Sequence, residues 1–139
     1  MSNPDDSRQP CALCVVPAER IWCQNEHALA FWDAYPLTEG HTLVIPQRHL
    51  ASVFDAEPAE LAALWRLVAE VRAGLLERFA PDGFTLGIND GVAAGQAIFH
   101  GHVHVIPRRR GDVPDPRGGI RWLIPERARY WTEPSSDPC

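Results

Sequence analysis

The chain has 139 residues, of which 45% are hydrophobic and 22% are charged, and its formal net charge is −5 with histidine taken as neutral. This length and composition are typical of one globular domain whose core needs no disulfide bonds. The acidic balance argues against binding of long nucleic acid, which requires a basic surface. No apolar run reaches the roughly 18 residues of a membrane span.

The N-terminal residues 1–10 are polar and include two prolines, so we expect them to form a flexible tail. They lack the apolar run of a signal peptide, which favours a cytoplasmic location. In that compartment the four cysteines of the chain are expected to be reduced.

The first strands are predicted between residues 20 and 46. Short apolar runs at 20–23 and 28–32, separated by a polar turn, indicate a β-hairpin. His41–Ile45 is rich in β-branched and apolar residues and predicts a third strand, which ends at Pro46.

A long helix is predicted to begin at Pro58, because proline is tolerated in a first helical turn. Apolar residues then recur at spacings of three and four, which gives one apolar face for packing against a sheet. Pro81 to Gly83 ends the helix. The apolar face consists of Leu61, Leu64, Trp65, Val68, Val71, Leu75 and Phe79.

Two further strands follow the helix. We expect one at 84–89 and, after the small-residue loop 90–95, a fifth strand that carries His100, His102 and His104. In a strand every second side chain points to the same face, so the three imidazoles would form a row with about 7 Å between neighbours. The other face of this strand would be apolar and consist of Phe99, Val103 and Val105.

This order of elements predicts an α+β domain with about five mainly antiparallel strands, one long helix and one short helix. We expect the domain to span 11–110. A C-terminal extension, 111–139, would pack on the domain or on a partner subunit, with Ile120–Ile124 as a short strand or a packing segment. An exposed edge of the sheet favours a homodimer.

The row of histidines indicates chemistry, because imidazole acts as base, acid, nucleophile or metal ligand near neutral pH. The alternative is that three of the six histidines occupy solvent-facing polar positions by chance. Arg108 to Arg110 directly follow the row. They either supply positive charge for a small anionic ligand or form a solvated strand exit.

The segment His100-Gly-His-Val-His-Val-Ile-Pro107 resembles the signature of the histidine triad (HIT) family, in which three histidines alternate with apolar residues. The resemblance covers about residues 11–110 and implies a HIT-like fold. Gly101 departs from the family pattern, because that position is usually bulkier. Other segments that match in the same order are 29–36, Gly40–Pro46, and Asn89 followed by Gln96.

The resemblance implies a nucleotide hydrolase or nucleotidyl transferase that acts at the α-phosphate of nucleoside monophosphate esters, amidates or dinucleoside polyphosphates. His102 would be the nucleophile and form a covalent nucleotidyl-histidine, which water then hydrolyses. A neutral imidazole can attack phosphorus when its other nitrogen donates a hydrogen bond. His104 and Asn89 would stabilise the charge that develops on the phosphate.

The resemblance also implies contacts to a purine nucleotide. Asp33 would accept hydrogen bonds from the two ribose hydroxyls, with an ordinary turn residue as the alternative for this position. Trp32 or the neighbouring Phe31 would line the base pocket, although one of the two must face the core, and Gln96 would lie near the leaving group. Ala97 departs from the family, where a serine or threonine often follows that glutamine.

Cys11-Ala-Leu-Cys14 is a second motif, because a Cys-x-x-Cys turn directs two thiolates at one tetrahedral ion. Some bacterial HIT proteins complete such a zinc site with two histidines, which here are His49 and His100. The resemblance thus implies a closed, structural zinc site. A redox motif is the alternative, although the βαβ context of a thioredoxin-like site is missing.

Two other interpretations stay open at this level. The three histidines are compatible with a catalytic zinc centre that binds three imidazoles and one water. A nucleotide-binding or scaffolding domain without catalysis would keep Asp33 and the pocket, but it would not need a nucleophile at His102.

Overall fold

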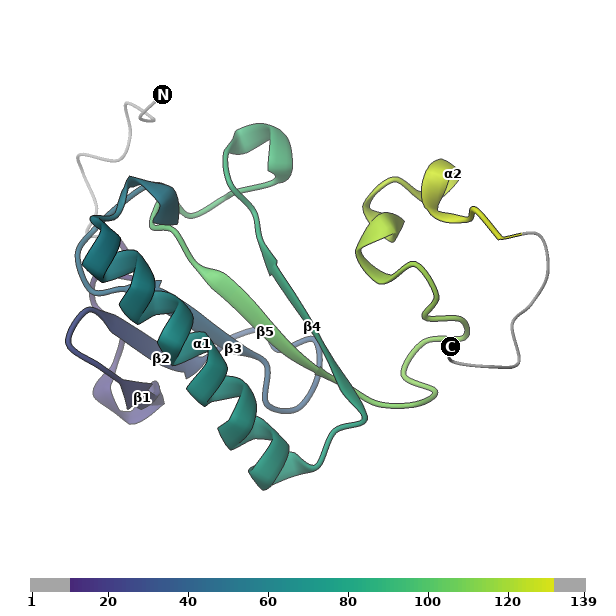
Figure 1. The fold of residues 1–139 in the computed structure, drawn as a ribbon, viewed down its shortest axis with the longest axis horizontal. Coiled ribbons are helices and arrows are strands. Elements are labelled where there is room, and N and C mark those ends of the chain that lie inside the picture. Colours follow the sequence, from purple (N-terminus) through teal and green to yellow (C-terminus); the bar gives the residue numbers. More distant parts are fainter. Residues whose placement is uncertain (1–10, 132–139) are drawn as a thin grey trace. The chain divides into compact units, whose positions relative to one another are not determined.

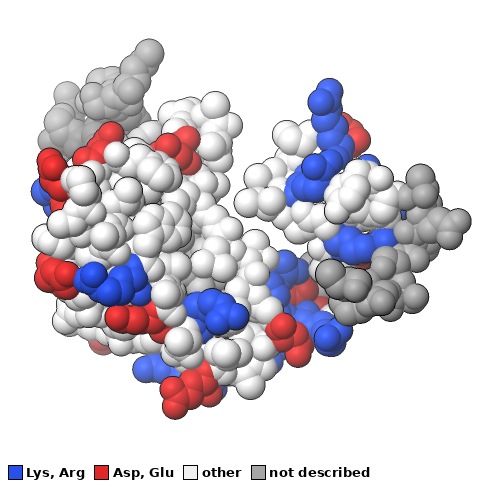
Figure 2. All heavy atoms as spheres, in the orientation of Figure 1, with Lys and Arg blue, Asp and Glu red and all other residues white. Residues whose placement is uncertain are grey.

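The computed structural model describes residues 11–131, so the predicted tail 1–10 and the end of the C-terminal extension, 132–139, lie outside it. The chain forms two compact units that divide between Arg109 and Arg110. On the face of the first unit that Figure 2 shows, basic side chains are interspersed with acidic ones. None of the described helices has the length and hydropathy that a transmembrane helix requires.

Five strands form one antiparallel sheet in the order β1-β2-β3-β5-β4 (Figure 1). The predicted α+β fold is therefore confirmed. Because β5 lies between β3 and β4, the last strand of the chain is an interior strand. The strands are β1 (Ile21–Gln24), β2 (Ala28–Trp32), β3 (Thr42–Pro46), β4 (Gly83–Ile88) and β5 (Val103–Arg108).

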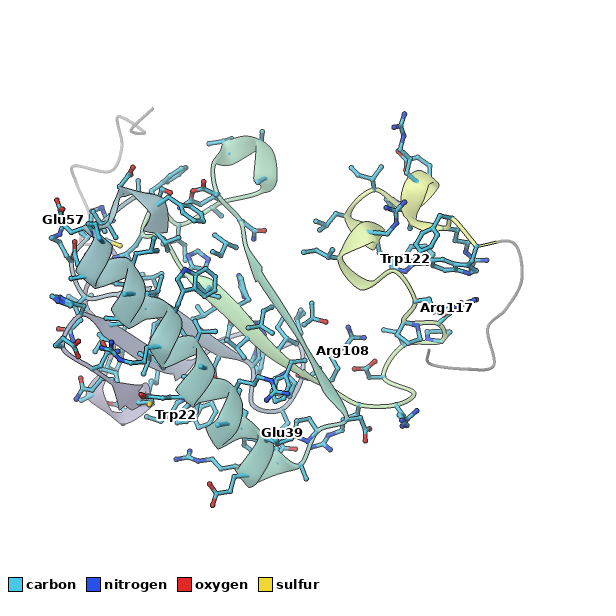
Figure 3. The ribbon with its side chains drawn as sticks, viewed as in Figure 1. Trp22, Glu39, Glu57, Arg108, Arg117 and Trp122 are labelled. Carbon is cyan, nitrogen blue, oxygen red and sulfur yellow. The ribbon has the colours of Figure 1, made fainter. Side chains whose placement is uncertain are left out.

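The long helix α1 spans Pro58–Phe79 and packs on one face of the sheet (Figure 1). Glu57, at the N-terminal end of α1 in Figure 3, forms a capping box with Glu60. In this box the Glu57 amide donates to the Glu60 carboxylate at 2.9 Å. The capping box and the proline together explain why the helix begins where the sequence predicts.

Apolar side chains cover both faces of the sheet. The face toward α1 includes Val44, Val103 and Val105, and the opposite face carries a second cluster made of Leu13, Phe31, Leu43 and Ile45. The predicted apolar face of the helix is wrong at Trp65, which is 43% exposed. In place of Trp65, the buried face of α1 includes Ala63 and Leu67, which are fully buried.

The last strand begins later than the sequence predicts, so His100 and His102 precede it. The cause is local. The Gly101 amide donates to the Leu50 carbonyl at 2.7 Å, and the backbone here thus bonds to a loop instead of the sheet. A Cβ on residue 101 would lie 2.6 Å from the Val53 nitrogen. This close approach explains why residue 101 is a glycine, although the corresponding position in the family usually holds a bulkier residue.

Short helical turns complete the described chain. In the C-terminal unit, Ile120–Ile124 is not a strand, because η4 covers most of this segment. Arg117 and Arg121 of this unit lie over the rings of Trp131 and Tyr130, at 4.6 and 4.9 Å from the ring centroids. Packing of the extension on the domain or on a partner stays a prediction. The turns are η1 (Ala18–Arg20), η2 (Val53–Asp55), η3 (Val92–Ala94), η4 (Gly119–Leu123) and α2 (Pro125–Ala128).

Candidate active site and metal centre

His102 and His104 lie side by side, with ring centroids 5.2 Å apart. Val103 and Val105 face the helix, so the two histidines lie on the opposite face of the sheet. His102 is 9% exposed. The predicted row of three histidines on one strand is wrong: only His104 lies on β5, and the His100 ring lies in a separate group with Cys11, Cys14 and His49.

The tautomer of a neutral His102 ring follows from one hydrogen bond. Its Nδ1 lies 2.8 Å from the backbone oxygen of His100. A carbonyl oxygen only accepts, so Nδ1 carries the proton, and a neutral ring then has its lone pair on Nε2. Nε2 of a neutral His102 is therefore the ring nitrogen with a lone pair to offer.

His104 contacts His41, which lies in the Gly40–Pro46 segment that resembles the family. Nδ1 of His104 lies 2.9 Å from Nε2 of His41, and His41 is 3% exposed. Burial, and to a smaller extent the neighbouring His102 and His41, together lower the pKa of His104 to about 4, although Asp33 acts in the opposite direction. His104 is thus neutral at physiological pH.

Asp33 follows β2 directly and reaches the same cluster. Its Oδ2 lies 3.5 Å from Nε2 of His41. Its Oδ1 accepts a hydrogen bond from the Tyr35 amide at 2.7 Å. Asp33 therefore shapes the turn, as expected for an ordinary turn residue. It also lies beside the histidines, as a contact to the ribose would require.

Trp32 points to the other side of the sheet. Its ring stacks on Trp22 with centroids 4.9 Å apart and contacts the edge of Phe79, in the last turn of α1. This placement argues against Trp32 as the wall of a base pocket beside His102. Phe31, the alternative, lies on the histidine side.

Asn89 lies next to His102 because of the strand register. Ile88 of β4 pairs with Val103 of β5. In an antiparallel pair the next residues outward are Asn89 and His102, which therefore neighbour each other. Gly87 stands opposite His104, so β4 places no side chain there.

Gln96 is 7% exposed, and both ends of its amide are bound to backbone. Its Nε2 donates to the Ala51 and Ile98 oxygens at 2.7 and 3.1 Å, and its Oε1 accepts from the Gly91 amide at 2.9 Å. The structure thus gives Gln96 the role of holding the loop before the histidines.

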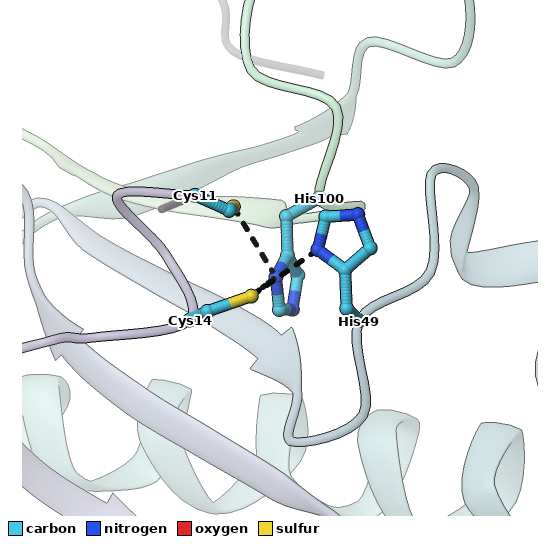
Figure 4. A group of neighbouring side chains, drawn as sticks. All are labelled: Cys11, Cys14, His49 and His100. Atoms are coloured by element: carbon cyan, nitrogen blue, oxygen red, sulfur yellow. Dashed lines mark hydrogen bonds between the residues drawn. The ribbon is translucent and has the colours of Figure 1, made fainter. Parts of the chain in front are cut away.

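The residues predicted to bind zinc come together as one group, which is shown in Figure 4. The ligand atoms of Cys11, Cys14, His49 and His100 all lie within 4.8 Å of one another. Nδ1 of His100 lies 3.8 and 3.6 Å from the sulfurs of Cys11 and Cys14, and Nδ1 of His49 lies 3.2 Å from that of Cys14. These values bracket the edge of about 3.6 Å expected between N and S ligands of tetrahedral zinc.

The tautomer of His100 also fits a metal. Its Nε2 lies 2.8 Å from the Pro46 oxygen and must donate to it, so the lone pair of the neutral ring is on Nδ1, beside the sulfurs. A catalytic three-histidine centre does not fit. Among residues 11–131, no group of three or more potential ligands includes His102.

Sequence comparison now adds to this geometry. Residues 15–111 match the family of the HIT domain. The chain belongs to the HIT domain family. This confirms the resemblance that the histidine motif indicated.

Relatives in the HIT family differ in their named activities. A 16.1 kDa HIT-like protein of Mycoplasma pneumoniae is 42% identical over 85 residues, which are 61% of this chain and 59% of that protein. The adenylylsulfatase HINT3 of Arabidopsis thaliana is 33% identical over 73% of this chain and 54% of its own length. An asymmetrical bis(5′-nucleosyl)-tetraphosphatase of Schizosaccharomyces pombe is 38% identical over 69% of this chain and 53% of its own length.

Solved structures of the family have the same fold. A HIT family protein of Bacillus subtilis is 33% identical, with a TM-score of 0.66 over 73% of each chain. A zinc-bound histidine triad family protein of Mycobacterium smegmatis is 38% identical, with the same TM-score, over 76% of this chain and 84% of its own.

Proposed function

We propose that this HIT protein is a nucleotide hydrolase or nucleotidyl transferase that forms a covalent bond between His102 and the α-phosphorus of a nucleotide. The observation that carries the proposal is the bond from His102 Nδ1 to the His100 oxygen, which leaves Nε2 as a free nucleophile. The relatives named as an adenylylsulfatase and a tetraphosphatase support it, since both names describe cleavage at a nucleotide phosphate.

The reaction would take two displacements. The lone pair of His102 Nε2 forms a bond to the α-phosphorus, and the leaving group departs with the electrons of its own bond to phosphorus. Water then attacks the phosphorus, the bond to Nε2 breaks, and a nucleoside monophosphate is released. The His100 carbonyl stabilises the positive charge that the ring carries in the intermediate.

The surrounding residues would bind the nucleotide. His104 and Asn89 lie beside His102 and would donate hydrogen bonds to the phosphate. Asp33 would accept from the ribose hydroxyls, and a purine base would lie over the Phe31 side of the sheet. Gln96 would contribute indirectly by holding the adjacent loop. A homodimer and a cytoplasmic location stay predictions.

We further propose that Cys11, Cys14, His49 and His100 hold a structural zinc ion. Four protein ligands leave no open position for a substrate, which is the arrangement of structural zinc. The zinc-bound relative from Mycobacterium smegmatis supports this assignment. The ion would fix the N-terminal segment against His100, and the redox interpretation of the cysteines is less suited to a group that includes two histidines.

The test is to trap the intermediate. The protein is mixed with an adenosine phosphoramidate that carries a fluorescent amine, quenched within the first turnovers, digested and measured by mass spectrometry. We expect the mass of an AMP moiety on the peptide that contains His102. His102→Ala should lose the adduct and at least about 10³-fold in turnover, while His27→Ala should behave as wild type. Full turnover in His102→Ala would contradict the mechanism, and nucleotide binding without turnover in the wild type would favour a binding domain without catalysis.

A further inference from the structure

A chain of hydrogen bonds connects the loop after β2 to His104. The Leu37 amide donates to Nδ1 of His41 at 3.0 Å. An amide nitrogen has no lone pair to offer, so Nδ1 of His41 must accept. Burial keeps this ring neutral, because it lowers the pKa of His41. The single proton of His41 is therefore on Nε2.

The position of this proton on Nε2 of His41 determines the tautomer of the neighbouring ring, His104. Nε2 of His41 lies 2.9 Å from Nδ1 of His104, so His41 donates and His104 accepts. A neutral His104 that accepts at Nδ1 carries its own proton on Nε2. His104 thus offers an N–H donor, and the Leu37 amide is the group that fixes this choice.

His41 and His104, together with Asp33, also form a group of potential metal ligands. Ligand atoms of Asp33, His41 and His104 all lie within 4.8 Å of one another. A metal on Nε2 of His41 would force the ring proton to Nδ1, where the Leu37 N–H already points. The backbone therefore favours the hydrogen-bond chain over a metal site.

Asp33 competes with His104 for one proton. Its Oδ2 lies 3.5 Å from Nε2 of His41, against 2.9 Å for Nδ1 of His104. Hydroxyl groups that donate to Asp33 would reduce its attraction for that N–H. The His41 proton would then bind His104 alone.

We propose that His41 is a positioning residue that fixes His104 as a donor to the phosphate, and that Asp33 couples ribose binding to this donor. The second half of this inference rests on the proposed function. It means that the ribose hydroxyls contribute to catalysis as well as to affinity: ribonucleotides gain a better donor at the phosphate, and dideoxynucleotides do not.

The first experiment reads the tautomer in the free protein. The full chain is labelled with ¹⁵N-histidine, and long-range ¹H–¹⁵N spectra assign each ring, with His104→Gln identifying the His104 signals. We expect the Nε2–H tautomer in wild type and in His41→Gln, whose amide can still donate. His41→Glu can only accept, so His104 should change to Nδ1–H and kcat should fall by about 100-fold. Thr38→Val changes a side chain of the same loop that takes no part in the hydrogen-bond chain from Leu37 to His104. This variant should match wild type in the His104 tautomer and in kcat.

The outcome in wild type decides the first half even if a variant does not fold. An Nδ1–H tautomer of His104 in the wild-type protein would overturn it. Loss of activity in His41→Gln equal to that in His41→Glu, with both folded, would show that His41 acts only as packing.

The second experiment uses AMP and 2′,3′-dideoxy-AMP at saturation. AMP should shift the His41 and His104 ring signals, and this shift should be absent with dideoxy-AMP and in Asp33→Asn. With the matching phosphoramidates, removal of both hydroxyls should lower kcat about tenfold in addition to raising KM. Equal shifts and equal kcat for the two nucleotides would overturn the coupling. Failure of both to bind would overturn the proposed function together with the coupling, but it would leave the tautomer result intact.

Discussion

Nδ1 of His102 donates to the backbone oxygen of His100 at 2.8 Å, while the ring of His100 belongs to the cysteine–histidine group. His100 thus orients the proposed nucleophile, His102, through its backbone and would hold the proposed zinc through its side chain. Since the orientation of His102 depends on the His100 carbonyl and not on the His100 ring, metal binding and chemistry should separate experimentally.

His49→Ala tests this separation. The substitution removes a proposed zinc ligand and leaves the His100 carbonyl in place, so it should lower zinc content and lower Tm by at least about 5 °C, since a structural ion contributes to folding. Turnover per folded molecule should be largely kept. Elemental analysis and thermal unfolding provide the measurements, with His27→Ala as the control. Equal zinc content in His49→Ala and wild type would remove His49 from the ligand set.

Gly101→Ala tests the close approach of the loop. The added Cβ would meet the Val53 nitrogen at 2.6 Å and the Val53 side chain at 2.8 Å, and backbone has to move to relieve the first contact. We expect a loss of about 1–3 kcal/mol in the free energy of unfolding. Gly83→Ala is a matched control, because nothing lies within 4 Å of its Cβ. Urea unfolding curves that coincide for the two variants would contradict the prediction.

The low pKa of His104 predicts a dependence of stability on pH. The folded-state pKa is about 4, against 6.5 for the ordinary residue. Between these values the unfolded chain binds a proton that the folded chain does not, so the contribution of His104 is complete above about pH 7 and is lost as the pH falls toward 4.

The comparison of wild type with His104→Gln isolates this effect. From pH 7.5 to pH 5 the free energy of unfolding of wild type should fall more than that of the variant, by about 2 kcal/mol. Urea titrations at both pH values measure the difference, and proton effects at the cysteine–histidine group cancel in it. Parallel losses in the two proteins would show that His104 titrates normally.

Gln96→Glu should loosen one end of the loop before the histidines. The carboxylate can still accept from the Gly91 amide but cannot donate to the Ala51 oxygen. We expect a loss of about 1–3 kcal/mol, because a buried carbonyl is left without its partner. Hydrogen exchange should show Gly91 still protected and faster exchange near residues 96–98. Faster exchange at Gly91 as well would mean that the two ends of the amide act as one unit.

Local patterns were sufficient for most of the fold. The apolar run of β2 and the proline at the start of α1 predict those elements because their determinants lie within a few residues. The predicted start of the last strand was wrong, because the Gly101 amide donates to the Leu50 carbonyl. Leu50 is 51 positions away in the sequence, so no local pattern reveals this contact.

The candidate site was predictable in its ligand types and less so in its orientation. The four metal-binding candidates meet as predicted, because the family resemblance supplied the long-range pairing. Trp32 and Phe31 are neighbours on a strand that is covered on both faces, so alternation alone cannot tell which of them shares a face with the histidines. The role of His41 depends on a partner 63 positions away.

The cysteine–histidine group joins segments that are 35, 86 and 89 positions apart in the chain. Its first members precede every strand, and His100 precedes only the last one. Assembly of this group therefore requires the closure of long loops, which has an entropic cost. An ion bound there would stabilise only chains in which these distant segments have met, and would therefore discriminate the finished topology from partly folded chains.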